Sequence, residues 1–239
     1  MALRFAGKHA AVVGATGVIG SHIAAAFARH GASVTLLGRS ALTQRARLEA
    51  QLSAAAPKDL TTSSSSSSPR THHFIKLDVS DAASIKAVFA GRAEQSAAAA
   101  TTTAAAAVVG PVDVLVNCAG ISQTTVLKRT PDEELARIMD TNLLATMLVC
   151  KHARMQPHGC IVNVSSLMAT HGGFGASAYA ASKAGLIDLK PELQQAFLKD
   201  TPLGRVADPD EVADAAVFLA SNQFANNCIL NLDGGLSAA

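Results

Sequence analysis

Short runs of β-branched and apolar residues alternate along the chain with longer, alanine-rich stretches whose apolar positions recur at helical spacing. Both faces of the short runs are apolar, which is typical of strands in a parallel sheet covered by helices on each side. The predicted strands are His9–Val13, Ser33–Leu37, His73–Leu77, Val112–Val116, Cys160–Val164 and Cys228–Leu232. The predicted helices are Gly20–His30, Ser40 to about Ala56, one entering at Ala82 after the N-cap Asp81, Asp132–Ala153 and Pro209–Ala220. This alternation predicts an α/β fold with a doubly wound parallel sheet of the Rossmann type.

Two segments of low complexity interrupt the alternation. Residues 53–70 contain the serine run Ser63–Ser68. Residues 96–107 begin with Ser96 and continue as alanine interrupted by Thr101–Thr103. Neither can bury much apolar surface per ordered residue. We expect a surface loop at the first, and at the second an insertion or an extension of the helix that begins near Asp81. We expect residues 1–239 to form one domain that carries both insertions.

Composition narrows the classes of protein to consider. The chain has 239 residues, a formal net charge of +2 and 49% hydrophobic residues, so we expect no nucleic-acid partner and no general disorder. The uncharged stretch Ala10–Ala28 is rich in alanine and glycine, so we expect no membrane span. The four cysteines are scattered and the eight histidines show no ligand pairing, so we expect free thiols and no metal. The N-terminus lacks an Arg/Ser-rich leader, so we expect a cytoplasmic protein, with the mitochondrial matrix as the alternative.

A glycine-rich turn joins the first predicted strand to the first helix and holds Gly14, Thr16, Gly17, Ile19 and Gly20. Glycines there let the backbone approach a pyrophosphate, whose charge the helix N-terminus stabilises. A tight turn that only packs closely is the alternative explanation.

Polar residues follow three further predicted strands, at the sheet edge where such folds bind dinucleotides. Arg39 and Ser40 follow the second strand, and an arginine there accommodates a 2′-phosphate, which favours NADP(H) over NAD(H). A solvated surface arginine is the alternative. The other candidates near the cofactor are Asp78, Val79, Asn117, Ala119 and Gly120, although the last three also suit a plain turn.

Ser166, Tyr179 and Lys183 form the strongest constellation of reactive side chains. Tyr179, the only tyrosine, stands four residues before Lys183, so the two share one face of a helix. A free phenol is a poor acid–base catalyst at neutral pH. A lysine ammonium ~6 Å away, at an effective dielectric constant of ~20, favours the phenolate by ~3 kcal/mol, or about two pKa units. A tyrosine at the core margin beside a solvated lysine is the alternative.

Together the glycine turn, Asn117–Gly120, Asn142, Ser166, Tyr179 and Lys183 resemble the short-chain dehydrogenase/reductase family over nearly the whole chain. The resemblance implies that Tyr179 protonates the developing alkoxide while a nicotinamide delivers hydride. It implies that Ser166 binds the carbonyl oxygen, that Lys183 holds the nicotinamide ribose and that Asn142 positions a relay water. Gly14, Thr16, Ile19 and Gly20 would line the pyrophosphate.

Within the family, four segments most resemble 3-oxoacyl-[acyl-carrier-protein] reductases of fatty acid synthesis: Thr141–Lys151, Pro202–Arg205, Glu211–Ser221 and Leu232–Gly235. The resemblance implies a free or carrier-bound 3-oxoacyl thioester as substrate, and a homo-oligomer or heteromer as the assembled form. Lys128 and Arg129 would face an acidic carrier protein, or are an ordinary exposed basic pair.

The sequence departs from the family pattern in two places. Val13 and Val18 replace a threonine and a glycine of the usual glycine motif, where Gly17 supplies an alternative. After Lys183 the chain runs through Lys190 directly into Pro191. Compared with the family pattern, a helix remainder, a sixth strand and its loop, together about 20–30 residues, are missing. Cys228–Leu232 must then pair with the fifth strand or leave an exposed sheet edge. A catalytically impaired dinucleotide-binding or subunit protein is therefore the alternative function.

Overall fold

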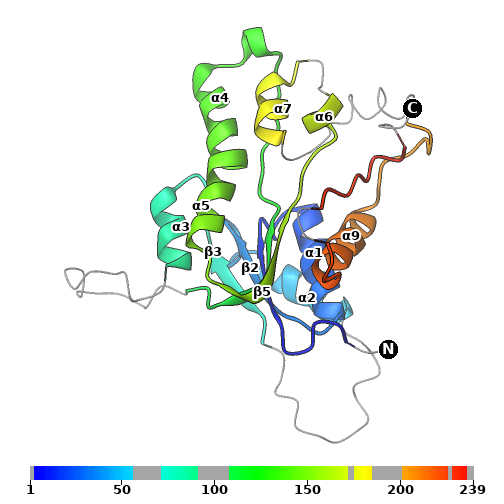
Figure 1. Cartoon of the computed structure of the whole chain (residues 1–239). Coiled ribbons are helices and arrows are strands. Elements are labelled where there is room, and N and C mark those ends of the chain that lie inside the picture. The colour runs from blue at the N-terminus through cyan, green and yellow to red at the C-terminus, as the bar shows by residue number, and fades with distance from the viewer. Residues whose placement is uncertain are drawn as a thin grey trace, which may run out of the picture.

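A single parallel sheet forms the centre of the protein. The computed structural model describes residues 3–55, 71–90, 108–171, 175–184, 201–225 and 228–235. The sheet has the order β3-β2-β1-β4-β5, which confirms the predicted doubly wound topology (Figure 1). Its strands are β1 (His9–Val13), β2 (Ser33–Gly38), β3 (His73–Lys76), β4 (Val112–Asn117) and β5 (Met155–Asn163). In the register, Val13 lies opposite both Leu37 and Asn117, so β1, β2 and β4 end at one common edge.

Helices cover both faces of this sheet. On one face α1 (Val18–Arg29) packs between α2 (Arg45–Ala55) and α9 (Pro209–Ser221), and this core includes Ile23, Phe27 and Leu48. On the other face α3 (Ala82–Phe89) packs against α5 (Ala145–His152) over Ile85, Phe89 and Leu115. Figure 1 shows the two layers on opposite sides of the strands. The apolar positions of β1 to β4 are therefore buried on both faces, whereas Ile161 of β5 stays exposed.

The predicted helix Asp132–Ala153 is interrupted internally by a wider turn. α4 (Asp132–Met139) continues through a π-helical turn, η4 (Asp140–Leu144), into α5. A π turn adds one residue to a helical turn and so rotates the side chains it carries, a distortion that often lies at functional sites. Here the turn carries Thr141 and Asn142, both buried.

The upper part of the molecule in Figure 1 contains α4 and two short helices, α6 (Met168–His171) and α7 (Ser177–Lys183). α7 packs against α4, η4 and α6. The short 3₁₀ turn η3 (Leu127–Arg129) precedes α4. This arrangement places α7 beside the π turn, and both carry predicted site residues.

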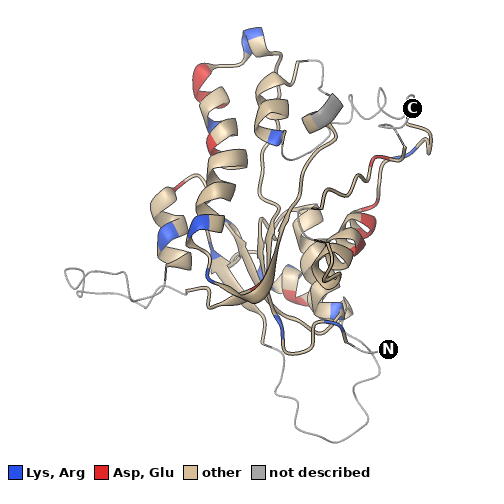
Figure 2. Ribbon diagram, viewed as in Figure 1, with Lys and Arg blue, Asp and Glu red and all other residues tan. Residues whose placement is uncertain are grey.

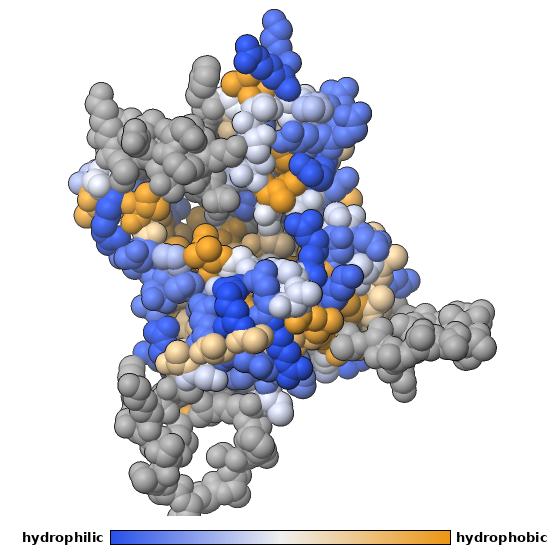
Figure 3. Space-filling view, turned by 180° about the vertical axis from the view of Figure 1, so that it is seen from behind, coloured by the Kyte–Doolittle hydropathy of each residue, from blue (hydrophilic) through white to orange (hydrophobic). Residues whose placement is uncertain are grey.

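The prediction of a strand at Cys228–Leu232 is wrong. In the described part of the chain this segment pairs with no strand, and Ile229 is 90% exposed. β5 is consequently an edge strand, whose Ile161 is 42% exposed. The physical reason is that a strand needs a hydrogen-bonded neighbour, and no described residue forms a parallel strand between β5 and Cys228. Figure 3, which views the opposite face, shows further apolar patches on a mainly hydrophilic surface.

Several sequence predictions fall largely outside the described residues. α2 ends at Ala55 and α3 ends at Phe89, so most of 53–70 and all of 96–107 lie beyond what the structure describes. The junction at Lys190 also lies outside it. None of the helices in the described ranges is long and apolar enough to cross a membrane.

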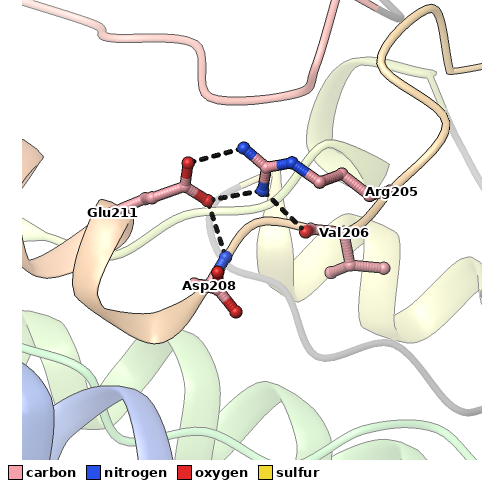
Figure 4. Close-up of polar contacts among 4 residues, drawn as sticks. All are labelled: Arg205, Val206, Asp208 and Glu211. Carbon is pink, nitrogen blue, oxygen red and sulfur yellow. Dashed lines mark hydrogen bonds and ion pairs between the residues drawn. The ribbon is translucent and has the colours of Figure 1, made fainter.

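A bidentate ion pair ties the segment before α9 to the first turn of that helix (Figure 4). Arg205 Nη2 and Nη1 donate to the two carboxylate oxygens of Glu211 at 2.7 and 2.8 Å. Glu211 also accepts a hydrogen bond of 2.7 Å from the backbone N–H of Asp208, the N-cap residue. These bonds lower the pKa of Glu211 to about 2, chiefly through the contact with Arg205.

Candidate active site

The glycine turn after β1 is shaped by two positions that admit no side chain. Gly14 has φ +84°, and a Cβ there would lie 2.6 Å from the backbone nitrogen of Ala119. A Cβ on Gly20 would collide with the carbonyl oxygen of Gly14. Gly17 is the N-cap of α1, which has no side-chain cap and no acidic residue in its first turn. The first N–H groups of α1 are therefore available to an anion.

The end of β2 lies directly beside this turn. A Cβ on Gly38 would lie 2.9 Å from Thr16 Oγ1, so the two loops pack closely. Arg39 is exposed and makes no hydrogen bond or ion pair with any described residue. Ser40 Oγ accepts a hydrogen bond of 2.8 Å from Gln44 Nε2. Arg39 thus presents a cation next to the glycine turn.

Asp78 follows β3 and is held as a carboxylate. Its Oδ1 accepts hydrogen bonds from the hydroxyl and backbone N–H of Ser80 at 2.7 and 3.0 Å. These bonds, with the nearby charge of Arg39, hold the pKa of Asp78 below its ordinary value despite some desolvation. Val79 is half-buried and packs on the core under α3. Asp78 and Val79 therefore lie at the predicted edge of the sheet.

Asn117, at the end of β4, points into the protein. Its Nδ2 donates to Asn163 Oδ1 at 2.9 Å and to Cys150 Sγ at 3.4 Å. Its Oδ1 is buried and accepts no hydrogen bond from any residue that the structure describes. The side chain of Asn117 thus links β4 to β5. A cofactor bound at this edge would instead contact the following loop, at Ala119 and Gly120.

Asn142 on the π turn connects this loop to α7. Its Oδ1 accepts from the backbone N–H of Ile121 at 2.8 Å, and its Nδ2 donates to the Ile121 carbonyl at 2.9 Å. Nδ2 also donates a hydrogen bond to Ser182 Oγ at 2.9 Å. Ser182 in turn donates to the carbonyl of Tyr179 at 2.9 Å. Asn142 therefore holds the loop after β4 and helix α7 in one arrangement.

Tyr179 and Lys183 lie on the inner face of α7. Tyr179 is 1% exposed and Lys183 is 5% exposed, so Lys183 is not the solvated lysine of the alternative interpretation. Lys183 Nζ lies 5.6 Å from the centroid of the Tyr179 ring. A buried ammonium at this distance acts on the phenol through a medium of low polarity.

Lys183 reaches the loop after β4 above Gly120. A Cβ on Gly120 would lie 2.8 Å from Lys183 Nζ and 3.3 Å from Asn142 Oδ1. The charge of Lys183 also reaches Cys118, although burial dominates and raises the pKa of that thiol to about 11. The structure therefore brings Lys183, Asn142 and Gly120 together beside Tyr179.

Ser166 lies in the short segment between β5 and α6. Its Oγ accepts a hydrogen bond of 2.9 Å from the backbone N–H of Met168. Ser166, Asn142 and Ser182 all line one open cavity of about 2080 Å³, which extends along β5 towards Cys228–Leu232. Ser166 thus faces the same cavity as Asn142 and Ser182.

Gln123 is a positioning residue that the sequence interpretation missed. Its Oε1 accepts from the backbone N–H groups of Ala178 and Tyr179 at 3.1 and 3.3 Å. Its Nε2 donates to Thr130 Oγ1 at 3.0 Å and to the Thr125 carbonyl at 2.8 Å. Gln123 satisfies the first turn of α7 from a loop more than fifty residues earlier, a contact that no local pattern signals.

The basic pair Lys128 and Arg129 forms the exposed turn η3. It is followed at once by the acidic first turn of α4, Asp132–Glu134. Figure 2 shows the basic turn and the acidic helix start next to each other. The local charge is therefore mixed.

The known proteins that this chain resembles are dehydrogenases and reductases. The short chain dehydrogenase family matches residues 8–201. The chain is 36% identical over 159 residues to 3-oxoacyl-[acyl-carrier-protein] reductase of Mus musculus, covering 54% of this chain and 67% of that protein. It is 31% identical over 268 residues to 3-oxoacyl-[acyl-carrier-protein] reductase FabG of Chlamydia muridarum, covering 96% and 97%.

Two further similarities broaden this comparison. Carbonyl reductase family member 4 of Xenopus tropicalis is 33% identical over 160 residues, covering 54% of this chain and 68% of that protein. The crystal structure of a dehydrogenase/reductase from Sinorhizobium meliloti 1021 superposes with a TM-score of 0.76 at 21% identity, covering 98% of this chain and 97% of that one. At that identity the structural likeness speaks for the fold alone.

Proposed function

Because the chain belongs to the short-chain dehydrogenase/reductase family of oxidoreductases, which bind nicotinamide dinucleotides, we propose that it uses NADPH to reduce a 3-oxoacyl thioester carried by acyl carrier protein. The product is the 3-hydroxyacyl thioester of fatty acid synthesis. The observation that carries the proposal is the meeting of Lys183, Asn142 and Gly120 beside the buried Tyr179.

The residues of the site fit a nicotinamide dinucleotide. The backbone at Gly14 and Gly20 leaves a surface that a Cβ would fill, and the start of α1 offers N–H groups to a pyrophosphate. When bound, the reduced nicotinamide supplies hydride to the carbonyl carbon of the substrate. Arg39 supports NADPH as the donor, because an exposed arginine after β2 attracts a 2′-phosphate.

The side chains of the site handle the proton. Tyr179 donates its phenolic proton to the carbonyl oxygen as negative charge develops there, and the Lys183 ammonium stabilises the phenolate that remains. Ser166 Oγ donates a hydrogen bond to the same oxygen. Asn142 Oδ1 keeps a second lone pair beyond its bond from Ile121, and that lone pair accepts from a relay water.

The substrate assignment rests on the relatives, two of which carry the name 3-oxoacyl-[acyl-carrier-protein] reductase. For the carrier, Lys128 and Arg129 offer exposed cations near the site, although Asp132 and its neighbours reduce the net charge. We also propose a cytoplasmic location, with the mitochondrial matrix as the alternative, and assembly with further subunits through the open edge of β5.

Replacing Tyr179 tests the assigned acid. In an assay of NADPH oxidation with an acetoacetyl thioester, Tyr179→Phe is expected to lower turnover at least about a hundredfold, because general acid catalysis contributes that much. NADPH binding, followed by its fluorescence, is expected to stay within about twofold, since the ring is retained. Unchanged turnover would show that another group supplies the proton.

A second function is favoured by the open edge of β5. The cavity of about 2080 Å³ lies between β5 and the unpaired segment Cys228–Leu232, on the side where the nicotinamide half would bind. The alternative is therefore a dinucleotide-binding or subunit protein with impaired catalysis. Rapid NADPH oxidation by the unmodified chain would exclude it, whereas binding of NADPH without turnover would support it.

A further inference from the structure

Arg47 reaches from α2 to the glycine turn. Its Nη2 donates a hydrogen bond of 3.1 Å to the carbonyl oxygen of Thr16. Its Nη2 and Nε also donate to Gln44 Oε1 at 2.7 and 3.2 Å. Gln44 in turn bonds Ser40 Oγ, the residue after Arg39. One chain of hydrogen bonds thus joins the loop after β2 to the glycine turn through this guanidinium.

The position of Arg47 coincides with the rim of the adenosine site. In a sheet of this topology the ribose 2′ position lies between the glycine turn and the end of the second strand. Thr16 and Gly38 form the contact between these two elements, and Arg47 touches the Thr16 carbonyl from the α2 side. Arg39 begins the loop at the opposite end of the same hydrogen-bond chain.

The charge of Arg47 is held without a counter-ion. Its hydrogen-bond acceptors are a carbonyl and an amide oxygen, and no carboxylate in the described residues pairs with it. Nη1 makes no hydrogen bond to a described residue. Arg45 on the same helix differs, because it pairs with Glu49 at 2.7 Å and lies over the Phe74 ring. Of the two arginines on α2, Arg47 is therefore the one held by neutral acceptors, with no carboxylate among the described residues beside it.

We propose that Arg47 is a second cation for the 2′-phosphate of NADP(H), acting together with Arg39. Arg47 Nη1 donates to the phosphate, while Nη2 stays anchored to Thr16. A dianionic phosphate suits two guanidinium groups because charge-assisted hydrogen bonds to Arg are strong and directional. The inference rests on the proposed preference for NADPH and adds to it a specificity-determining residue outside the loop that follows β2.

A pair of ligands that differ only in the 2′-phosphate tests this assignment. Adenosine 2′,5′-bisphosphate and adenosine 5′-monophosphate both lack the nicotinamide half, so the open edge of β5 does not enter the measurement. Titration calorimetry on the full chain is expected to show that Arg47→Met weakens the bisphosphate about tenfold or more and the monophosphate less than about twofold. Arg45→Met removes the same charge from the same helix and is expected to change neither affinity.

The outcomes separate the inference from the proposed function. If the unmodified chain binds both ligands equally, the preference for NADPH is wrong. If it prefers the bisphosphate and Arg47→Met keeps the whole preference, the role of Arg47 is wrong while the preference for NADPH stands. Equal weakening of both ligands would show that Arg47 only orders the glycine turn, which also overturns the inference. Thermal melting of each variant confirms that it is folded.

Discussion

Gly120 offers a way to displace Lys183, the lysine proposed to act in catalysis, without disturbing the fold. In Gly120→Ala the new methyl group would lie 2.8 Å from Lys183 Nζ, whereas ordinary contacts begin near 3.4 Å. The amine must therefore retreat by roughly 0.6 Å, and a misplacement of about 1 Å at a reacting group costs up to about a hundredfold in rate. We expect kcat/KM for the thioester to fall by about ten- to a hundredfold.

Stability is expected to change little in this variant. Gly120 does not have a positive φ, and the clashing atom nearest to the new methyl is the end of a flexible side chain. Alanine at such a position also restricts the unfolded chain, which raises the free energy of unfolding by about 0.4–1 kcal/mol. Urea denaturation followed by circular dichroism measures this quantity.

Gly110→Ala is the matched control, because a Cβ there meets nothing within 4 Å and φ is not positive. This variant is expected to keep the kcat/KM of the unmodified chain. If Gly120→Ala matches Gly110→Ala in kcat/KM at equal stability, then the position of Lys183 over Gly120 has no part in catalysis, and the assigned site is wrong.

Three further perturbations follow from the same structure. Gly14→Ala is expected to lower the free energy of unfolding by about 3 kcal/mol, since φ is +84° and backbone atoms block the methyl; a loss under about 1 kcal/mol would contradict this. The pKa of Glu211 is lowered from 4.5 to about 2, so its pairing with Arg205 stabilises the fold above pH 4.5 and loses that effect as the pH falls towards 2. Unfolding curves of Glu211→Gln and the unmodified chain should therefore differ at neutral pH and converge in acid. Burial raises the pKa of Cys118 to about 11, so iodoacetamide should label the exposed Cys228 first, as mass spectrometry of the peptides will show.

Much of the candidate site could be predicted from local patterns. The glycine spacing required a tight approach at Gly14 and Gly20, and the structure shows backbone atoms where their side chains would be. The four-residue spacing placed Tyr179 and Lys183 on one helical face, and both are buried there. These predictions succeed because turn geometry and helical periodicity depend on neighbours close in sequence.

Contacts between segments far apart in the sequence could not be predicted from local patterns. The bonds from Gln123 to the first turn of α7 and from Arg47 to Thr16 each join separate elements. The π turn that aims Asn142 at Ile121 was predicted only as part of a regular helix. The contacts of Asn142 with Ile121 and Ser182 join segments far apart in the sequence and exist only once the chain has folded.

Cys228–Leu232 separates what the sequence pattern predicts from what the tertiary structure decides. Its sequence has the apolar character of a strand, as does that of β1 to β5, and pattern alone treats them alike. The amino-acid order was enough to predict the five paired strands and the turn beside them, although β5 begins at Met155 and not at the predicted Cys160. Whether the sixth apolar run became a strand depended on a hydrogen-bonding partner at the edge of β5. Such a partner is a property of the assembled sheet, because the backbone N–H and C=O groups of a strand must pair with those of another segment.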